Sequence, residues 1–121
     1  MNLDGPHLKP LRSIAKHHQV NILIGINEID NSQSRTTLFN SYVHIDGDGS
    51  YANVHRKLMP TNPERMVWGF GDGQGLRVNE TQVGRVGSLI CWKTTCRLLA
   101  WLCSHKVLKF LLRRHGIVVM A

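Results

Sequence analysis

The run VNILIGINEI, residues 20–29, constrains the fold of this chain more than any other stretch. Most of its residues are apolar or β-branched, and they follow one another almost without interruption. Such a run is typical of a β-strand that is covered on both faces of its sheet. Because 121 residues leave room for only one small domain, we expect this buried strand to belong to a single folded unit.

The segments on either side of this run indicate a mixed α/β or α+β fold. In DGPHLKPLRSIAKHHQ, Asp4 is a candidate cap, and apolar positions recur at helical spacing, which predicts a short amphipathic helix. The residues on its expected inner face are Leu8, Leu11, Ile14, Ala15 and His18. Downstream, TTLFNSYVHI and GSYANVHR flank the turn signal DGDG at 46–49, which favours an antiparallel hairpin. Together these elements predict a domain with a substantial sheet.

Residues 57–75, KLMPTNPERMVWGFGDGQG, are too rich in Pro, Gly and Asn for a strand and too interrupted for a long helix. We expect a loop with one helical turn at 63–67. Its GFGDGQG segment lacks the GK[ST] of a phosphate-binding loop, and we interpret its glycines as a requirement of loop geometry. A short strand at 76–78, a turn at Gly84 and a buried strand that ends at Cys91 are predicted to follow.

The net charge of +7 is distributed very unevenly along the chain. Residues 1–92 hold nine Lys or Arg and all eight Asp or Glu, whereas residues 93–121 hold six bases and no acid. A nearly neutral body is therefore followed by a basic tail of different composition. We interpret the two segments separately, and we expect neither nucleic acid nor a membrane as a partner of the body.

The cysteines and histidines lack the spacing of a metal site. Cys91, Cys96 and Cys103 are odd in number and form no CxxC pair, and the seven histidines form no HExxH motif. No stretch approaches 18 consecutive apolar residues, and the first ten residues lack the basic start and apolar core of a signal peptide. We therefore expect reduced thiols, no metal or other cofactor, and a cytoplasmic location.

Three side chains are candidates for chemistry. Cys91 stands where an apolar strand stops, the position from which α/β enzymes present a nucleophile into a cleft. On that feature alone, such a cysteine is more often a small buried apolar residue. Lys57 precedes the loop, and a lone lysine is usually a solvated charge. Glu64, beside Arg65, has the alternatives of a helix cap or a surface ion pair.

In combination these residues acquire a more specific meaning. HRKLMPTNPERMVWGFGDG at 55–73, followed by VGRVGSLICW at 83–92, closely resembles the nitrilase branch of the carbon–nitrogen hydrolase superfamily, and the resemblance extends over residues 1–92. It implies that Lys57 is the catalytic lysine, Cys91 the nucleophile and Glu64 a further active-site glutamate. It also implies a partial four-layer α-β-β-α sandwich, a small-molecule nitrile as substrate, no cofactor, and homo-oligomers in intact members.

The chemistry of nitriles supports this assignment. A nitrile carbon is electrophilic but weakly polarised, so a thiolate is a suitable attacking group. A nearby ammonium lowers the pKa of the thiol and stabilises the charge that develops on nitrogen. The expected route runs through a thioimidate and a thioester to the carboxylic acid, with release of ammonia and with water activated by a general base.

The chain departs from the family pattern in two places. The family's general-base glutamate lies upstream of anything in this sequence, and Glu28 does not match its motif, so we expect a chain that begins inside the fold, is inactive alone and is marginally stable. After Trp92 the family continues ENYMPLAR, whereas this chain continues KTTCRLLAW. Loss of one G from a coding run for the family sequence yields this continuation, and we hypothesise that residues 93–121 are a frameshift product.

Two alternatives stay open. An amidase-type member of the same superfamily would share the cysteine and the lysine. In the other alternative, the chain is a non-catalytic fragment or a binding module, in which residues 98–114 form a basic amphipathic helix for membranes or nucleic acid. For that segment we favour a poorly packed, sticky terminus.

Overall fold

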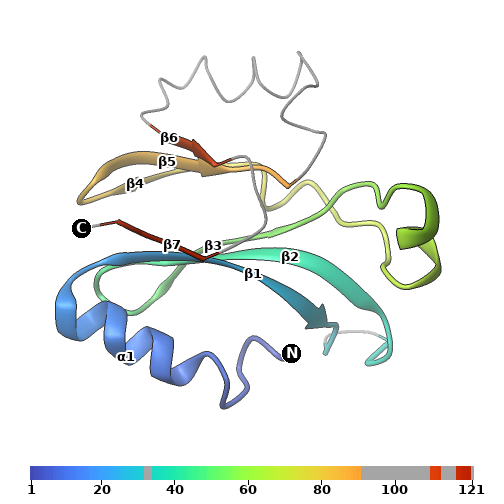
Figure 1. Ribbon diagram of the computed structural model, residues 1–121, viewed down its shortest axis with the longest axis horizontal. Coiled ribbons are helices and arrows are strands. Elements are labelled where there is room, and N and C mark those ends of the chain that lie inside the picture. Colours follow the sequence, from blue (N-terminus) through green and yellow to red (C-terminus); the bar gives the residue numbers. More distant parts are fainter. Residues whose placement is uncertain (32–33, 91–109, 113–116, 121) are drawn as a thin grey trace.

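Helix α1 covers the outer face of one β-sheet, and a smaller sheet packs on the opposite face of the first (Figure 1). The computed structural model describes residues 1–31, 34–90, 110–112 and 117–120. Its elements are α1 (Lys9–His18), β1 (Asn21–Ile29), β2 (Leu38–Ile45), β3 (Tyr51–Arg56), the 3-10 helix η1 (Asn62–Met66), β4 (Val78–Thr81), β5 (Gly84–Ser88), β6 (Phe110–Leu112) and β7 (Ile117–Met120). The strand orders are β3-β2-β1-β7 and β4-β5-β6. The described residues thus form three layers, α-β-β, of the predicted mixed class.

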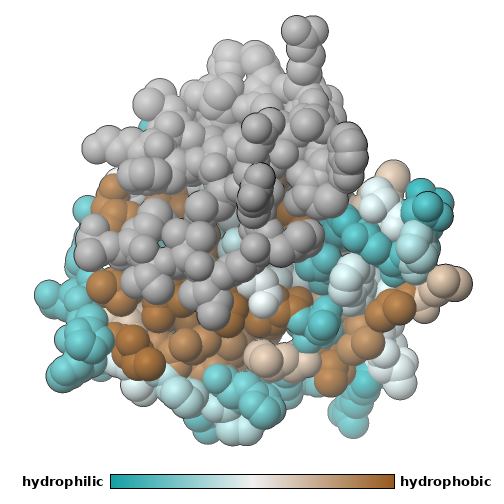
Figure 2. Space-filling model, viewed as in Figure 1, coloured by the Kyte–Doolittle hydropathy of each residue, from teal (hydrophilic) through white to brown (hydrophobic). Residues whose placement is uncertain are grey.

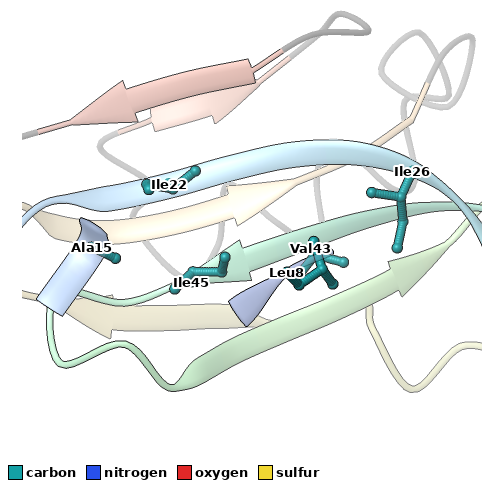
Figure 3. Close-up of a cluster of buried hydrophobic side chains, with 6 residues drawn as sticks. All are labelled: Leu8, Ala15, Ile22, Ile26, Val43 and Ile45. Atoms are coloured by element: carbon teal, nitrogen blue, oxygen red, sulfur yellow. The ribbon is translucent and has the colours of Figure 1, made fainter. Parts of the chain in front are cut away.

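The apolar run of residues 20–29 forms β1, which lies between β2 and β7. The buried cluster on the α1 side of the sheet contains Leu8, Ala15, Ile22, Ile26, Val43 and Ile45 (Figure 3). Leu23 points the other way and packs against Val86 of the smaller sheet, because successive side chains of a strand alternate between its faces. Burial on both faces is confirmed for the first half of β1, whereas Asn27 and Ile29 near its end are exposed.

The predicted hairpin is formed by β2 and β3, which pair antiparallel with Val43 opposite Val54. Its turn is closed by a hydrogen bond of 2.8 Å from the Gly49 amide to the carbonyl oxygen of Asp46. Gly49 has a φ of +83°, a conformation that strongly favours glycine. The DGDG signal therefore supplies both the tight turn and the residue that the turn requires, and the hairpin prediction is confirmed.

The predicted amphipathic helix is present as α1, with two differences in detail. Leu8 and Ala15 are buried and Leu11 is partly buried. Ile14 lies to one side of this stripe with 47% of its surface exposed, and His18 at the end of the helix is also exposed, so the prediction for these two residues is wrong. The prediction of Asp4 as the cap is also wrong. The helix begins later, after Leu8, and no side chain caps it.

The glycine-rich end of the loop lies along the outer edge of β3. A Cβ added at Gly71 would lie 2.7 Å from the Arg56 carbonyl oxygen, and one added at Gly75 would lie 2.4 Å from that of Val54. The Gly71 amide also donates a hydrogen bond of 2.9 Å to the Lys57 carbonyl oxygen. Close backbone approach therefore explains these glycines, as the interpretation of loop geometry predicted, and the loop covers an otherwise open sheet edge.

Two short strands come from the basic tail. β6 pairs parallel with β5, and β7 pairs antiparallel with β1. The helical alternative for residues 98–114 is wrong at 110–112, which are extended, and its other residues lie outside the described part of the chain. The preference for a poorly packed terminus stays a prediction. The sequence IVVM at 117–120 is β-branched and apolar, and β1 would otherwise present an unpaired edge to it.

Apolar side chains remain at the surface. Figure 2 shows them as a band across the lower half of the visible face. Near η1, Met66, Val67 and Phe70 are 84%, 57% and 60% exposed. Exposed apolar surface of this kind is a hallmark of contact sites or of incomplete packing, while the predicted marginal stability stays a prediction. Among the described residues, no helix is long and apolar enough to cross a membrane.

The edge contact of the glycine loop can be tested by substitution. Gly75→Ala should lower the free energy of unfolding by about 1–3 kcal/mol, because the new methyl group collides with backbone of β3 rather than with a movable side chain. Urea unfolding followed by tryptophan fluorescence measures the change. Gly73→Ala is the matched control, since nothing lies within 4 Å of its added Cβ and its φ is not positive. Equal destabilisation by the two substitutions would contradict the prediction.

Candidate active site

Lys57 lies directly after β3, in line with the side chains that face the smaller sheet. Its backbone amide donates a hydrogen bond of 2.7 Å to the Asn40 carbonyl oxygen, which continues the pairing of β2 with β3 by one residue. Its side chain is only 2% exposed, although lysine is usually solvated. The interpretation of Lys57 as an ordinary surface charge is therefore wrong, because the hairpin places it on the same face as the buried His55.

Glu64 supplies the counter-charge for this buried ammonium. The Lys57 Nζ donates a hydrogen bond to Glu64 Oε2, seven residues further along the chain. The same carboxylate oxygen accepts hydrogen bonds from the Thr61 amide at 2.8 Å and from the Thr61 hydroxyl at 3.1 Å. Threonine and glutamate three residues apart form a capping box at the start of η1. Glu64 is thus both a helix cap and an ion-pair partner, whereas Arg65 bonds to the Pro60 carbonyl oxygen.

The environment of Glu64 keeps its carboxyl ionised. Burial by itself raises the pKa of Glu64, but hydrogen bonds from Lys57 and Thr61 outweigh that effect and hold the pKa below its ordinary value. At neutral pH, the site therefore contains a carboxylate and a shielded ammonium in contact. The loop holds this pair in place at its base, where the Gly69 amide donates to the Leu38 carbonyl oxygen at 2.8 Å.

Two asparagines complete a polar row across the sheet beside Lys57. Asn27 of β1 is opposite Asn40 of β2, and Asn40 is in turn opposite Lys57. Residues opposite one another in antiparallel strands project from the same face. The indole Nε1 of Trp68, from the loop, donates to Asn27 Oδ1 at 3.0 Å. This row was not predicted from the sequence, although polar residues at alternate positions of an apolar strand, such as Asn40 and His44 of β2, are a signal that could have indicated it.

Other polar side chains also lie on this face of the larger sheet. His44 is 2% exposed, and its Nε2 lies 2.9 Å from Asn21 Oδ1. Burial lowers the pKa of His44, against a smaller opposing effect of Asp46, so the ring is neutral at pH 7. His55 is fully buried nearby on β3. Within the described residues, no group of three or more His, Cys, Asp or Glu could hold a metal ion.

Cys91 lies outside the described residues, so its predicted approach to Lys57 stays a prediction. The chain is described as far as Ile90, which is 2% exposed and belongs to a buried cluster with Leu23, Tyr42 and Val86. Leu23 and Tyr42 belong to the same face of the larger sheet as Lys57. The residue that precedes Cys91 is therefore packed in the layer between the two sheets.

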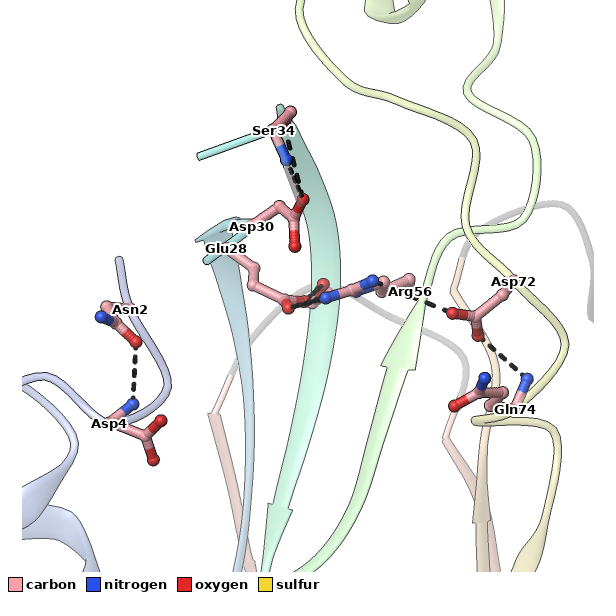
Figure 4. Close-up of polar contacts among 9 residues, drawn as sticks. Asn2, Asp4, Glu28, Asp30, Ser34, Arg56, Asp72 and Gln74 are labelled. Atoms are coloured by element: carbon pink, nitrogen blue, oxygen red, sulfur yellow. Dashed lines mark hydrogen bonds and ion pairs between the residues drawn. The ribbon is translucent and has the colours of Figure 1, made fainter. Parts of the chain in front are cut away.

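Glu28 is separated from this site by the thickness of the sheet. It lies on the α1 side of β1, where its carboxylate accepts hydrogen bonds from Arg56 Nε at 3.1 and 3.2 Å and from the Ser41 hydroxyl (Figure 4). Asp72 approaches the same guanidinium at 3.8 Å. Glu28 therefore braces the end of β3 from outside, in agreement with its failure to match the general-base motif.

The family model described as carbon-nitrogen hydrolase matches residues 1–120. The chain belongs to the carbon–nitrogen hydrolase family. Among its relatives, a bifunctional nitrilase/nitrile hydratase from Nicotiana tabacum is 36% identical over 99 residues, 82% of this chain and 27% of the relative. A cyanide hydratase from Gibberella baccata is 38% identical over 94 residues, 77% of this chain and 25% of the relative. The chain thus spans about a quarter of the length of the curated relatives it matches.

The fold of this carbon–nitrogen hydrolase chain agrees with the family. The crystal structure of a carbon–nitrogen hydrolase from Helicobacter pylori G27 matches it with a TM-score of 0.73 at 25% identity, over 87% of this chain and 36% of the other. The resemblance and the predicted partial sandwich are thereby confirmed. The boundary at residue 92 and the frameshift origin of the tail stay predictions.

The Lys57–Glu64 pair predicts a specific dependence of stability on pH. The pKa of Glu64 is lower in the folded chain than in the unfolded chain, where a glutamate titrates near about 4.3. As the pH falls from neutrality through this region, the unfolded chain binds the proton first, and the contribution of Glu64 to stability is lost. The free energy of unfolding of the wild-type chain should therefore exceed that of Glu64→Gln by about 1–3 kcal/mol near pH 7. This range is lower than that of fully buried ion pairs because Glu64 is partly exposed.

Urea unfolding of both chains from pH 7 to pH 3 measures this difference, which should shrink as the pH falls. Glu80→Gln is the matched control, because the Glu80 side chain is 84% exposed and lies 3.9 Å from its partner, Arg85. A constant difference between wild type and Glu64→Gln over the whole range would contradict the proposed coupling.

Proposed function

We propose that this chain carries the lysine and the nucleophile of a nitrile-hydrolysing active site, with Cys91 as nucleophile, Lys57 as proton donor and Glu64 as the residue that positions Lys57. The observation that carries the proposal is the Lys57 ammonium, which belongs to a side chain only 2% exposed and is ion-paired with Glu64. A structural lysine gains nothing from such burial, since desolvating a charge is costly. A lysine that must stabilise charge on a substrate gains a stronger interaction away from water.

The proposed reaction begins with attack of the Cys91 thiolate on the nitrile carbon. A C–S bond forms, one π pair of the C≡N bond moves to nitrogen, and this nitrogen takes a proton from Lys57, which gives a thioimidate. Water then adds to the carbon while a general base removes its proton. The remaining π pair of the C=N bond moves to nitrogen, which takes up that proton and then the second proton of the added water. The nitrogen leaves as ammonia with the C–N electron pair while the oxygen forms the C=O bond, which gives a thioester. A second water breaks the C–S bond, so one nitrile and two waters yield one carboxylic acid and one ammonia.

The general base in this scheme is a glutamate that the family resemblance provides and that no motif in residues 1–121 matches. We propose that nitrile hydrolysis by this chain alone therefore stops at the thioimidate, because water addition to it is slow without a base. The stalled species is a stable covalent adduct on Cys91. Its formation does not require turnover, which makes it a direct measure of the proposed nucleophile.

Small-molecule nitriles are the proposed substrates. The names of the relatives include nitrilase, nitrile hydratase and cyanide hydratase, which differ in whether a nitrile is converted to an acid or to an amide. Both outcomes begin with the same thioimidate, so either fits the proposed roles of Cys91 and Lys57. An amidase-type activity is the alternative, and it would release ammonia from amides without reaction with nitriles. Homo-oligomer formation and a cytoplasmic location stay predictions.

Incubation with an electron-poor aryl nitrile tests the nucleophile. Intact mass spectrometry should detect one adduct that increases the mass by that of the whole nitrile, because addition to a thiol loses no atom. Peptide mapping should place it on Cys91, and Cys91→Ala should abolish it. Cys96→Ala and Cys103→Ala are the matched controls and should leave it intact. An adduct that persists in Cys91→Ala, or its absence from the wild-type chain, would falsify the proposed function.

Removal of the ammonium tests the role of the lysine. Lys57→Met should slow formation of the adduct by about 10²–10³-fold, the range found when a single donor to a developing charge is deleted. Lys16→Met on α1 is the control, because that side chain is exposed on the outer face of the molecule. The rate of adduct formation is followed by mass spectrometry at fixed nitrile concentration. Equal rates for Lys57→Met and Lys16→Met would exclude Lys57 from the reaction.

A further inference from the structure

Asn40 is a buried polar residue without a described partner. The residue is 8% exposed, its carboxamide makes no hydrogen bond to any described residue, and its Oδ1 and Nδ2 are not among the described side-chain atoms that are fully shielded from solvent. The neighbouring asparagines differ in this respect, because Asn27 accepts a hydrogen bond from Trp68 and Asn53 donates one of 3.0 Å to the Gly75 carbonyl oxygen. The Asn40 carboxamide therefore has a donor and an acceptor that no described residue uses and that a small molecule could reach.

The register of the sheet places this carboxamide beside the ammonium. Asn40 is directly opposite Lys57, and the backbone hydrogen bond of 2.7 Å between them fixes that alignment. Opposite residues of antiparallel strands have Cβ atoms about 4.5–5.5 Å apart on one face. Tyr42, two residues along β2 on the same face, packs in one cluster with Ile90. Asn40 therefore lies between the Lys57–Glu64 pair and the cluster that precedes Cys91.

We infer that Asn40 is a substrate-binding residue, whose Nδ2 donates a hydrogen bond to the nitrogen of a nitrile or thioimidate beside Lys57 and whose Oδ1 accepts one from an N–H group of a thioimidate or primary amide. The inference rests on the proposed function and specifies how a nitrile or a primary amide would be held. Lys57 has only donors, and Glu64 occupies one of them. A carboxamide on the neighbouring strand adds the acceptor that an ammonium lacks.

This arrangement suits the nitrogen at each stage of the reaction. A nitrile nitrogen only accepts hydrogen bonds, and it becomes more negative as the thiolate adds, so two donors stabilise the transition state better than one. The nitrogen of a thioimidate or of an amide also carries an N–H group, which Asn40 Oδ1 can accept. The site therefore binds compounds with a small carbon–nitrogen group and discriminates against isosteres that lack it, because Asn40 would then stay unpaired.

Binding of a primary amide tests the inference without any reaction. The chain is labelled with ¹⁵N-asparagine and titrated with propionamide, and the Asn40→Asp variant identifies the side-chain signal of Asn40. That signal should shift in a saturable manner, while the signal of Asn79 on β4, which lies on the smaller sheet, should not move. Ethyl methyl ketone, which has no nitrogen, should leave the Asn40 signal unchanged. If propionamide causes no saturable shift of the Asn40 signal, the inference is overturned.

The rate of adduct formation on Cys91 gives a second, independent measurement. Asn40→Ala should slow it by about 10–10²-fold relative to wild type, as expected for loss of one neutral donor to a developing charge, and Asn79→Ala should leave it unchanged. Unfolding in urea verifies that both variants are folded. If Asn40→Ala forms the adduct as fast as the wild-type chain, the proposed contact in the transition state is overturned. If the wild-type chain forms no adduct, the proposed function fails, and the propionamide titration still decides whether Asn40 binds the carbon–nitrogen group.

Discussion

The burial of one ammonium group governs the geometry of this site. The Lys57 side chain is 2% exposed, and removing a charge from water costs several kcal/mol unless a counter-charge and hydrogen bonds replace the lost hydration. Glu64 supplies that counter-charge, and Thr61 fixes Glu64 from two directions. The loop between them therefore adopts a conformation in which a short helix begins where its first-turn carboxylate can reach back to β3. Its sequence, with a threonine and a glutamate three residues apart, provides the required cap.

The alternation of side chains along β1, β2 and β3 produces two different faces from the same strands. On the α1 side the larger sheet is mostly apolar, and its core is the cluster that includes Ile22 and Val43. On the other side lie Asn40, His44, His55 and Lys57, all buried. A polar layer between two sheets contributes less to stability than an apolar one would, because each buried polar group needs a partner. Its presence is best explained by function, since natural sequences depart from stable packing mainly at their sites.

Elements with a local signal could be predicted from the sequence. The hairpin follows from DGDG between alternating strands, the helical turn from the Asn-Pro before Glu64, and the buried strand from its apolar run. Of the two alternatives for Glu64, the helix cap is present, and the ion pair is made with the buried Lys57 rather than at the surface, because the single oxygen Oε2 accepts hydrogen bonds from both Thr61 and Lys57. The burial of Lys57 was not predicted from periodicity, and only the resemblance to nitrilases indicated its role.

The remaining details depend on tertiary contacts that no local pattern encodes. Ile14 fits a helical stripe but is exposed, since the sheet beneath α1 is in contact with Leu8 and Ala15 instead. Asn40 looks unremarkable in the sequence, and its position acquires meaning only when the register of β2 against β3 places it opposite Lys57. Which face of a strand is polar can be read from the sequence, but which other segment covers that face cannot.

The two halves of the proposed site differ in how much of the fold they need. Lys57 and Glu64 are seven residues apart, so their ion pair closes a short loop at the end of one hairpin. The approach of the segment that ends at Ile90 requires a second sheet to pack on the first through Leu23, Tyr42 and Val86, which are distant in the sequence. The charge arrangement is therefore a local property of the chain, whereas the placement of the nucleophile depends on packing between the sheets. A change that loosens this cluster should therefore displace the segment that ends at Ile90 while the ion pair remains, because the contacts described for the pair come from the loop and from β2.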